Sequence, residues 1–111
     1  MSKVTVYSFT NPIFGEEAPK FQLESLYQLL LGRKKELPEG SYTTSLFQSG
    51  INRMAQKVGE EAVETVIEAT NGTDDRLIYE ASDMIYHLIV LLTSKGYRIE
   101  DLARELVKRH K

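Results

Sequence analysis

The sequence predicts an all-α protein, an antiparallel bundle of about four helices, and two observations support this fold class. Apolar residues recur at helical spacing through most of the chain after Lys20, and clusters containing glycine or proline divide that part into separate segments. The longest segments are joined by a connection of only a few residues, which favours antiparallel neighbours. We therefore expect a helical domain over residues 20–111 and a distinct N-terminal arm over residues 1–19.

The N-terminal arm has the composition of a short strand followed by a link. Residues 4–9 are rich in β-branched and aromatic side chains, and Asn11 with Pro12 ends this run. No second strand is expected after it, because residues 14–19 are polar and contain breaker residues. We expect the arm to lie against a partner subunit or to extend along the bundle.

The first helix is expected over residues 20–37, and it ends before Pro38 and Gly40. Its apolar side is formed by Leu23, Leu26, Tyr27, Leu30 and Leu31. Basic residues near its C-terminus suit the helix dipole, and we favour this stabilising role over phosphate binding. They are Arg33, Lys34 and Lys35.

An amphipathic helix with one acidic face is expected over residues 46–70. Its periodic apolar residues are Ile51, Met54, Val58, Ala62, Val66 and Ala69. At ~100° per residue, a group of glutamates falls within about a quarter turn, and Lys57 shares this face. The glutamates are Glu60, Glu61, Glu64 and Glu68. Such a run is most often a solvated helix face, so it does not by itself indicate a site.

The next helix, over residues 74–94, is expected to be buried almost all round because residues 84–92 are nearly all apolar. Thr73 is its expected N-cap. Its narrow polar stripe consists of Arg76, Glu80, Asp83 and His87. Carboxylates in such a helix need partners, because desolvating an unpaired charge is costly, and a metal ion would be one. The apolar excess of residues 84–92 also predicts a homodimer.

The two acidic groups are predicted to form one site. Counted from the helix stop at Gly72, Glu64 and Glu80 both lie eight residues away, and Glu61 and Asp83 both lie eleven residues away. Equal offsets in a helical hairpin mean equal heights, and the two levels are roughly 4 to 5 Å apart along the axis. The carboxylates are therefore predicted to converge on one hard cation.

Net charge and composition limit the classes of molecule that this protein is expected to bind. The formal net charge of −2 gives no basic footprint for nucleic acid and no polybasic membrane anchor, and residues 84–92 are too short to span a bilayer. The absence of cysteine excludes a thiolate metal site, and no signal peptide is recognisable. We expect a cytoplasmic protein with a small-molecule partner, completed by a last helix over residues 99–108.

The chemistry of the carboxylates favours Mg²⁺ over zinc, with Mn²⁺ as a possible substitute. Because magnesium often binds polyphosphates, hydrolysis of a nucleotide phosphoanhydride is a chemical possibility. Glu60 is a candidate general base or supporting residue, and Lys57 a candidate phosphate contact. We favour His87 as a hydrogen-bonded core histidine over a metal ligand. The hydroxyl-rich residues 41–45 either cap a helix or bind phosphate or ribose oxygens, and composition leaves both roles open.

Two sequence patterns resemble known families. Glu60-Glu61-x-x-Glu64 followed by Glu80-x-x-Asp83 resembles the metal-binding pattern of the all-α nucleotide pyrophosphohydrolases, which include MazG-type enzymes and dimeric dUTPases. A longer pattern is similar to that of the phosphoribosyl-ATP pyrophosphohydrolase family of histidine biosynthesis. It comprises Pro38-Glu39-Gly40-Ser41-Tyr42-Thr43, Gly50, Lys57-Val58-Gly59-Glu60-Glu61-Ala62 and Glu80-Ala81-Ser82-Asp83-x-x-Tyr86-His87-Leu88.

The resemblance implies Mg²⁺-dependent hydrolysis of 1-(5-phosphoribosyl)-ATP to 1-(5-phosphoribosyl)-AMP and pyrophosphate by a homodimeric helical bundle. The implied metal ligands are Glu61, Glu64, Glu80 and Asp83, the catalytic residues Glu60, Glu61 and Glu64, and the substrate contacts Lys57, Tyr42, Thr43 and His87. Ser82 departs from the alanine expected in the second motif, and the arm lies outside the family pattern. The alternatives are a housecleaning nucleoside triphosphate pyrophosphohydrolase of the same superfamily and a non-catalytic helical interaction module.

Overall fold

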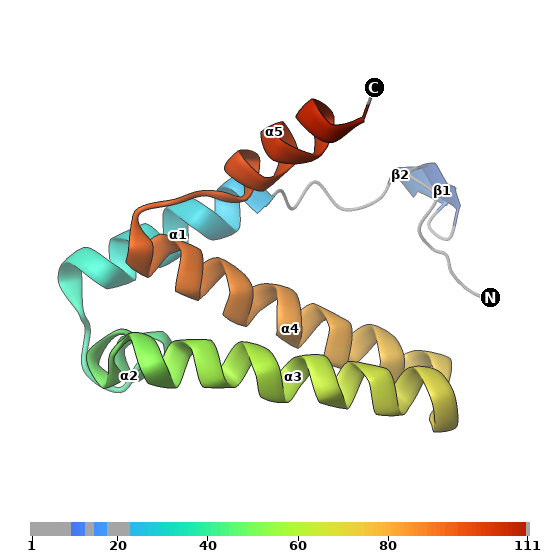
Figure 1. Ribbon diagram of the computed structural model, residues 1–111, viewed down its shortest axis with the longest axis horizontal. Coiled ribbons are helices and arrows are strands. Elements are labelled where there is room, and N and C mark those ends of the chain that lie inside the picture. The colour runs from blue at the N-terminus through green and yellow to red at the C-terminus, as the bar shows by residue number, and fades with distance from the viewer. Residues whose placement is uncertain (1–9, 13–14, 18–22, 111) are drawn as a thin grey trace.

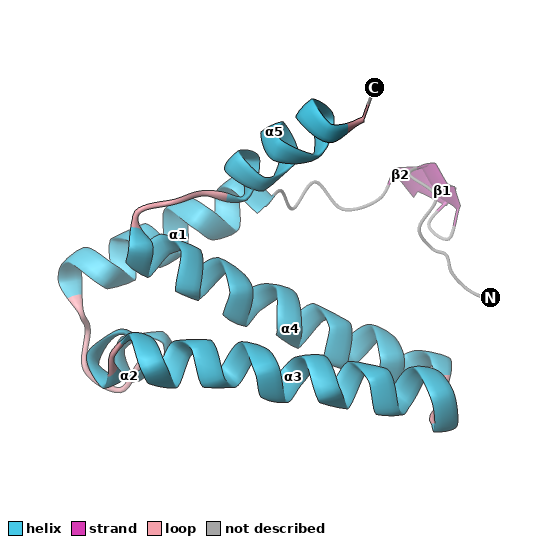
Figure 2. Ribbon diagram, in the orientation of Figure 1, coloured by secondary structure: helices cyan, strands magenta, loops and turns pink. Residues whose placement is uncertain are grey.

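The computed structural model describes residues 10–12, 15–17 and 23–110, and these residues form five helices and one small β-hairpin (Figure 1). The helices are α1 (Leu23–Glu36), α2 (Tyr42–Ser49), α3 (Ile51–Asn71), α4 (Asp74–Lys95) and α5 (Ile99–Arg109). The strands are β1 (Thr10–Pro12) and β2 (Gly15–Glu17). The predicted helical class is confirmed, as the colouring by secondary structure makes plain (Figure 2).

The two longest helices, α3 and α4, form the predicted antiparallel hairpin (Figure 1). Helix α3 ends at Asn71, and the backbone N–H of its C-cap, Gly72, donates to the carbonyl oxygen of Glu68 at 3.0 Å. Thr73 is the N-cap of α4, as predicted, and its hydroxyl accepts a hydrogen bond from the backbone N–H of Arg76 at 3.3 Å. A connection this short holds the two acidic segments at matching heights along the hairpin.

The prediction of one helix over residues 46–70 was wrong, because this stretch contains the end of α2 and most of α3, so the described residues form five helices where about four were expected. The break is at Gly50, whose φ of 93° is rarely adopted by residues with an L side chain. Apolar periodicity continues across Gly50 and therefore hid the break. Helix α2 begins at Tyr42, which places most of the hydroxyl-rich connection inside its first turns.

The prediction that no second strand follows Asn11 and Pro12 was also wrong. Strands β1 and β2 pair antiparallel, with Thr10 opposite Glu17 and Pro12 opposite Gly15. The polar composition of the second strand gave no strand signal, and its pairing satisfies backbone groups locally. The strand expected over residues 4–9 lies outside the described residues, so the arm as a whole stays a prediction.

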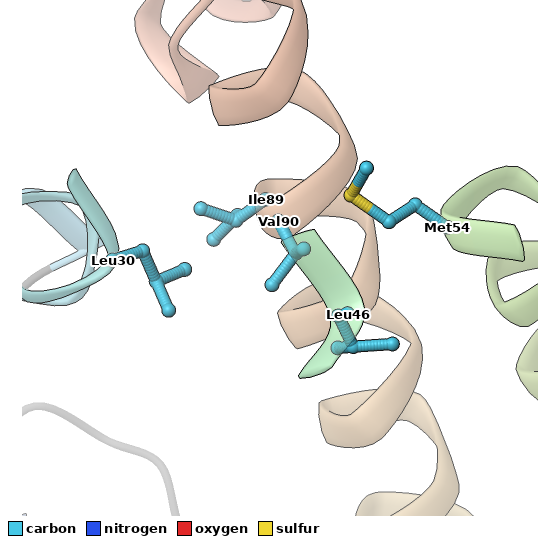
Figure 3. Close-up of a cluster of buried hydrophobic side chains, with 5 residues drawn as sticks. All are labelled: Leu30, Leu46, Met54, Ile89 and Val90. Atoms are coloured by element: carbon cyan, nitrogen blue, oxygen red, sulfur yellow. The ribbon is translucent and has the colours of Figure 1, made fainter. Parts of the chain in front are cut away.

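The core lies where α1 to α4 meet, and each of these helices contributes to it. Its fully buried apolar side chains are Leu30, Leu46, Met54, Ile89 and Val90, each at most 3% exposed (Figure 3). Helix α4 supplies two of the five, and from Glu80 to Ser94 only Ser82 is exposed. Most of the other residues from 80 to 94 are only partly buried and the first turns of α4 are exposed, so the expectation of a helix buried almost all round is only partly met.

Helix α5 contributes no buried residue and is attached mainly through its N-terminus. Arg98, which precedes it, pairs with Glu24 of α1 and lies over the ring of Tyr27, 4.4 Å from its centroid. Among the described residues, no helix has the length and apolar character needed to cross a bilayer. These features leave the α3–α4 hairpin, with α1 and α2 at one end, as the part that positions a site.

Candidate active site

The centre of the site is a carboxylate cluster made of Glu61 from α3 with Glu80 and Asp83 from α4. Glu61 is 8% exposed and Glu80 is 7% exposed, which is unusual for glutamates. Glu80 and Asp83 each lie within reach to hydrogen-bond the Glu61 carboxylate. The predicted juxtaposition of Glu61 with Asp83 is therefore present, and Glu80 joins the same carboxylate.

Because the carboxyl groups of this cluster are crowded, their pKa values shift in different directions. Burial raises the pKa of Glu80, and the hydrogen bond and the charge of Glu61 raise it further against the opposing effect of Arg76. Burial and the Glu61 charge likewise raise the pKa of Asp83. Burial alone would also raise the pKa of Glu61, but hydrogen bonds from Lys57, Asp83 and Glu80 outweigh it and lower that pKa. Without a cation, Glu61 is thus the preferred site of negative charge.

Two cations on the same helices compensate part of this charge. Lys57 Nζ lies 3.3 Å from Glu61 and 3.4 Å from Glu60, and Arg76 lies 2.7 Å from Glu80. Each of these ion pairs links residues one helical turn apart, which is the spacing of pairs that stabilise a helix. They therefore offer the carboxylates a partner other than a metal ion. Asp83 has no such partner of full charge among the described residues, since its ion-pair contact is with the ring of His87 at 3.4 Å.

His87 is buried, 3% exposed, and both of its ring nitrogens are engaged. Nδ1 lies 2.8 Å from the backbone carbonyl oxygen of Asp83, which can only accept, so Nδ1 carries the proton in the neutral ring. Nε2 then accepts a hydrogen bond from the hydroxyl of Tyr42 at 2.9 Å. The structure agrees with the predicted hydrogen-bonded core histidine and shows that its partner on α2 is Tyr42.

The donor set of the cluster fits a divalent cation. Glu61 and Asp83 each offer a carboxylate oxygen, and these two atoms lie within 4.8 Å of each other and of a ring nitrogen of His87. Because both nitrogens of His87 are engaged in hydrogen bonds, the carboxylates are the donors and His87 borders them. They come from two helices whose relative position is fixed by the hairpin. Carboxylate oxygens are the preferred donors for Mg²⁺ and Mn²⁺.

The other two glutamates predicted for the site, Glu60 and Glu64, lie at the edge of this centre. Glu64 is exposed, and its charge contributes to the raised pKa of Glu80, so it borders the cluster. Glu60 is exposed as well: its side chain is 44% exposed, accepts a hydrogen bond from Gln56 at 2.8 Å and approaches Arg53. Both glutamates are exposed, and the catalytic role of each stays a prediction.

An aromatic wall joins the cluster to α2. The hydroxyls of Thr43 and Tyr86 are hydrogen-bonded to each other, and the Tyr86 ring stacks on that of Tyr42 at 6.4 Å and 24°. Tyr86 also meets His87 edge to face at 5.0 Å. The buried hydroxyl of Thr43 thus holds Tyr86 in place. Tyr86 is the residue of this wall that sequence reasoning left without a role, although its spacing of three residues from Asp83 places both on one face of α4.

Comparisons with known proteins give one consistent result. Residues 23–110 match the family model described as phosphoribosyl-ATP pyrophosphohydrolase. The chain is 68% identical over 103 residues to a histidine biosynthesis bifunctional protein HisIE of Bacteroides thetaiotaomicron, covering 91% of this chain and 51% of the relative. It is 49% identical over 88 residues to a phosphoribosyl-ATP pyrophosphatase of Leptospira biflexa, covering 79% of this chain and 96% of the relative.

A second bifunctional relative shows the same pattern. The HisIE protein of Thermotoga maritima is 47% identical over 94 residues, which cover 85% of this chain and 47% of the relative. The chain therefore spans about half the length of the bifunctional relatives and nearly the whole length of the Leptospira relative.

Proposed function

We propose, because the chain belongs to the phosphoribosyl-ATP pyrophosphohydrolase family, that it hydrolyses phosphoribosyl-ATP to phosphoribosyl-AMP and pyrophosphate in the second step of histidine biosynthesis. The observation that carries the proposal is the convergence of carboxylates at the middle of the hairpin: oxygens of Glu61 and Asp83 lie within 4.8 Å of each other, and Glu80 reaches the same Glu61 carboxylate. A small-molecule nucleotide is the partner that such an acidic, metal-suited site would accept through its phosphates.

The cluster would hold Mg²⁺, or Mn²⁺ in its place, through Glu61, Glu64, Glu80 and Asp83. When bound, the cation supplies positive charge that offsets negative charge on the phosphate oxygens. Lys57 lies 3.3 Å from Glu61 and can contact a phosphate near the same carboxylate as a point charge. The hydrogen bond from His87 to the Asp83 carbonyl fixes the backbone that carries one ligand.

Two residues on α2 would contact the substrate beside the cluster. Tyr42 is half exposed and reaches His87 with its hydroxyl, and Thr43 positions the Tyr86 ring. Glu60 would act as a general base or would support Glu61 through their shared contact with Lys57. Cytoplasmic location fits a biosynthetic enzyme of this kind and forms part of the proposal.

A homodimer would bury apolar surface that the described part of the chain leaves exposed. On the half of the hairpin nearest its turn, these side chains are 46% to 61% exposed: Val63, Val66, Ile67, Ile78 and Tyr79. Residues 84–92, which suggested dimerisation from the sequence, are partly or fully buried within the chain. The apolar surface available to a partner therefore lies closer to the turn than expected.

The experiment that tests the activity follows pyrophosphate release from phosphoribosyl-ATP with Mg²⁺ and after chelation. We expect release that stops on chelation and falls at least about 100-fold in Glu64→Gln and Asp83→Asn. Glu68→Gln, one turn from Glu64 on the same helix, is the matched control and should keep its activity. Equal release after chelation would disprove metal dependence, and faster turnover of free nucleoside triphosphates would favour the housecleaning alternative.

A further inference from the structure

A cavity lies at the N-terminus of α2, beside the aromatic wall. Its volume is about 510 Å³. The residues that line it are Leu37, Glu39, Gly40, Ser41, Tyr42, Thr44, Ser45 and Gln48. None of the three carboxylate-cluster residues lines it, so it is separate from the candidate metal site. Tyr42 connects the two, because it lines the cavity and donates its hydroxyl to His87.

The backbone at this cavity presents hydrogen-bond donors. Gly40 adopts a φ of 82° in the turn before α2, and Ser41 is the N-cap. The Ser41 hydroxyl accepts from the backbone N–H of Thr44 at 3.2 Å and from Arg33 at 3.0 Å. The remaining N–H groups of the first turn point out of the helix end and have no partner within it, so the end carries a partial positive charge. Arg33 adds a full positive charge at the same place.

The hydroxyl of Thr44 is the independent sign that this cavity takes a ligand. Thr44 is 5% exposed, and its Oγ1 has no hydrogen-bond partner among the described residues. Thr93 shows the ordinary arrangement, because its buried hydroxyl donates to the Ile89 carbonyl oxygen at 2.7 Å. A buried hydroxyl without a partner is unfavourable, and a ligand oxygen in the cavity would supply the missing hydrogen bond.

We infer that this cavity binds a phosphate monoester, through the first-turn N–H groups of α2, the Thr44 hydroxyl and the charge of Arg33. The inference rests on the proposed function and extends it. Phosphoribosyl-ATP carries a monoester phosphate on its added ribose as well as its triphosphate, whereas ATP carries only the triphosphate. A phosphate site apart from the carboxylate cluster, joined to it by Tyr42, would therefore distinguish phosphoribosyl-ATP from ATP.

A negative charge at the cavity, that of Glu39, disfavours binding of an anion, and its removal provides a further test. Glu39 lines the same cavity, so its carboxylate repels a bound phosphate. Removing that charge in Glu39→Gln should strengthen phosphate binding, whereas it would weaken binding of a cation. The sign of this change separates an anion site from a cation site.

The direct test uses ribose 5-phosphate as a probe of the full chain in metal-free buffer with chelator. Backbone amide NMR shifts and calorimetry should show saturable binding centred on Tyr42 and Thr44, with ribose alone giving none. Thr44→Val should weaken binding about tenfold, Arg33→Gln should weaken it by a similar factor, and Glu39→Gln should tighten it about twofold or more. Thr93→Val, which alters an equally buried threonine away from the cavity, should leave the affinity unchanged.

Several results would overturn the inference without bearing on the proposed activity. They are no binding of ribose 5-phosphate to the folded wild-type chain, equal binding by Thr44→Val and Arg33→Gln, or weaker binding by Glu39→Gln. If Thr44→Val does not fold by circular dichroism, Arg33→Gln decides the outcome. In pyrophosphate release, Thr44→Val should raise KM for phosphoribosyl-ATP about tenfold with kcat unchanged, and any slower hydrolysis of ATP should be unaffected.

Discussion

At the scale of single residues, Asp83 is suited to bind a cation when ionised, and the same ionised form is unfavourable in the metal-free fold. Its pKa is raised above the ordinary 3.8, mainly by burial and by the charge of Glu61. A raised pKa in the folded state means that the protonated form is the one the fold favours. The contribution of Asp83 to the free energy of unfolding is therefore fully present below about pH 4 and is lost as the pH rises through the raised pKa.

Asp83→Asn should therefore stabilise the metal-free protein at pH 7.5 by a few degrees in Tm, because it removes one of the crowded negative charges. The advantage over the wild type should shrink as the pH falls toward 4. Mg²⁺ should raise the Tm of the wild type and leave that of Asp83→Asn unchanged. Thermal unfolding across this pH range checks both points, with Glu36→Gln, an exposed carboxylate on α1, as the control. A metal-free Asp83→Asn protein less stable than the wild type at pH 7.5 would contradict the argument.

The pairing of Glu61 with Asp83 could be predicted from the sequence because it depends only on helix rise and a short turn at Gly72. The hydrogen bond between Tyr42 and His87 could not, because it depends on how α2 docks on α4. The missing partner of Thr44 Oγ1 also depends on that docking. Sequence spacing fixes contacts within a hairpin and leaves contacts between separately connected helices open.

At the scale of the elements, the glycine between α2 and α3 decides the geometry of the site. Gly50 has a φ of 93° and a ψ of 169°, a region almost restricted to glycine. It turns the chain between two helices that a continuous apolar pattern would join. Because α2 carries Tyr42 and Thr43 to the face of α4, the break is needed for the aromatic wall to form.

Gly50→Ala should lower the free energy of unfolding by roughly 1 to 3 kcal/mol, because alanine is strained at that φ and ψ. Gly59→Ala offers the matched comparison with the opposite sign. Gly59 lies inside α3 with open space where a Cβ would point, so alanine there should add about 0.5 to 1 kcal/mol. Urea unfolding measures both, and a neutral Gly50→Ala would show that the break tolerates an ordinary residue.

At the scale of the whole molecule, the described part of the chain has a small core and many exposed apolar side chains. Five apolar side chains are fully buried, whereas thirteen large hydrophobic residues remain more than a third exposed. The sequence predicted a homodimer that would help bury apolar helix faces, but it placed the apolar excess on residues 84–92. Those residues are covered by α1, α2 and α3, which the sequence alone could not arrange around α4.

The surface that we expect at a dimer interface is the exposed apolar part of α3 near the turn, where Val66 is 61% exposed and Ile67 is 46% exposed. Val66→Asp and Ile67→Asp each place a charge where apolar area would be buried, so each should shift the protein toward monomer at micromolar concentration. Asn52→Asp adds the same charge to an exposed position nearer the start of α3 and should leave the assembly unchanged. Sedimentation velocity over a hundredfold range of concentration measures the shift. An unaltered dimer in both variants would place the interface on another surface, and the exposed Leu106 and Val107 of α5 would be the next residues to test.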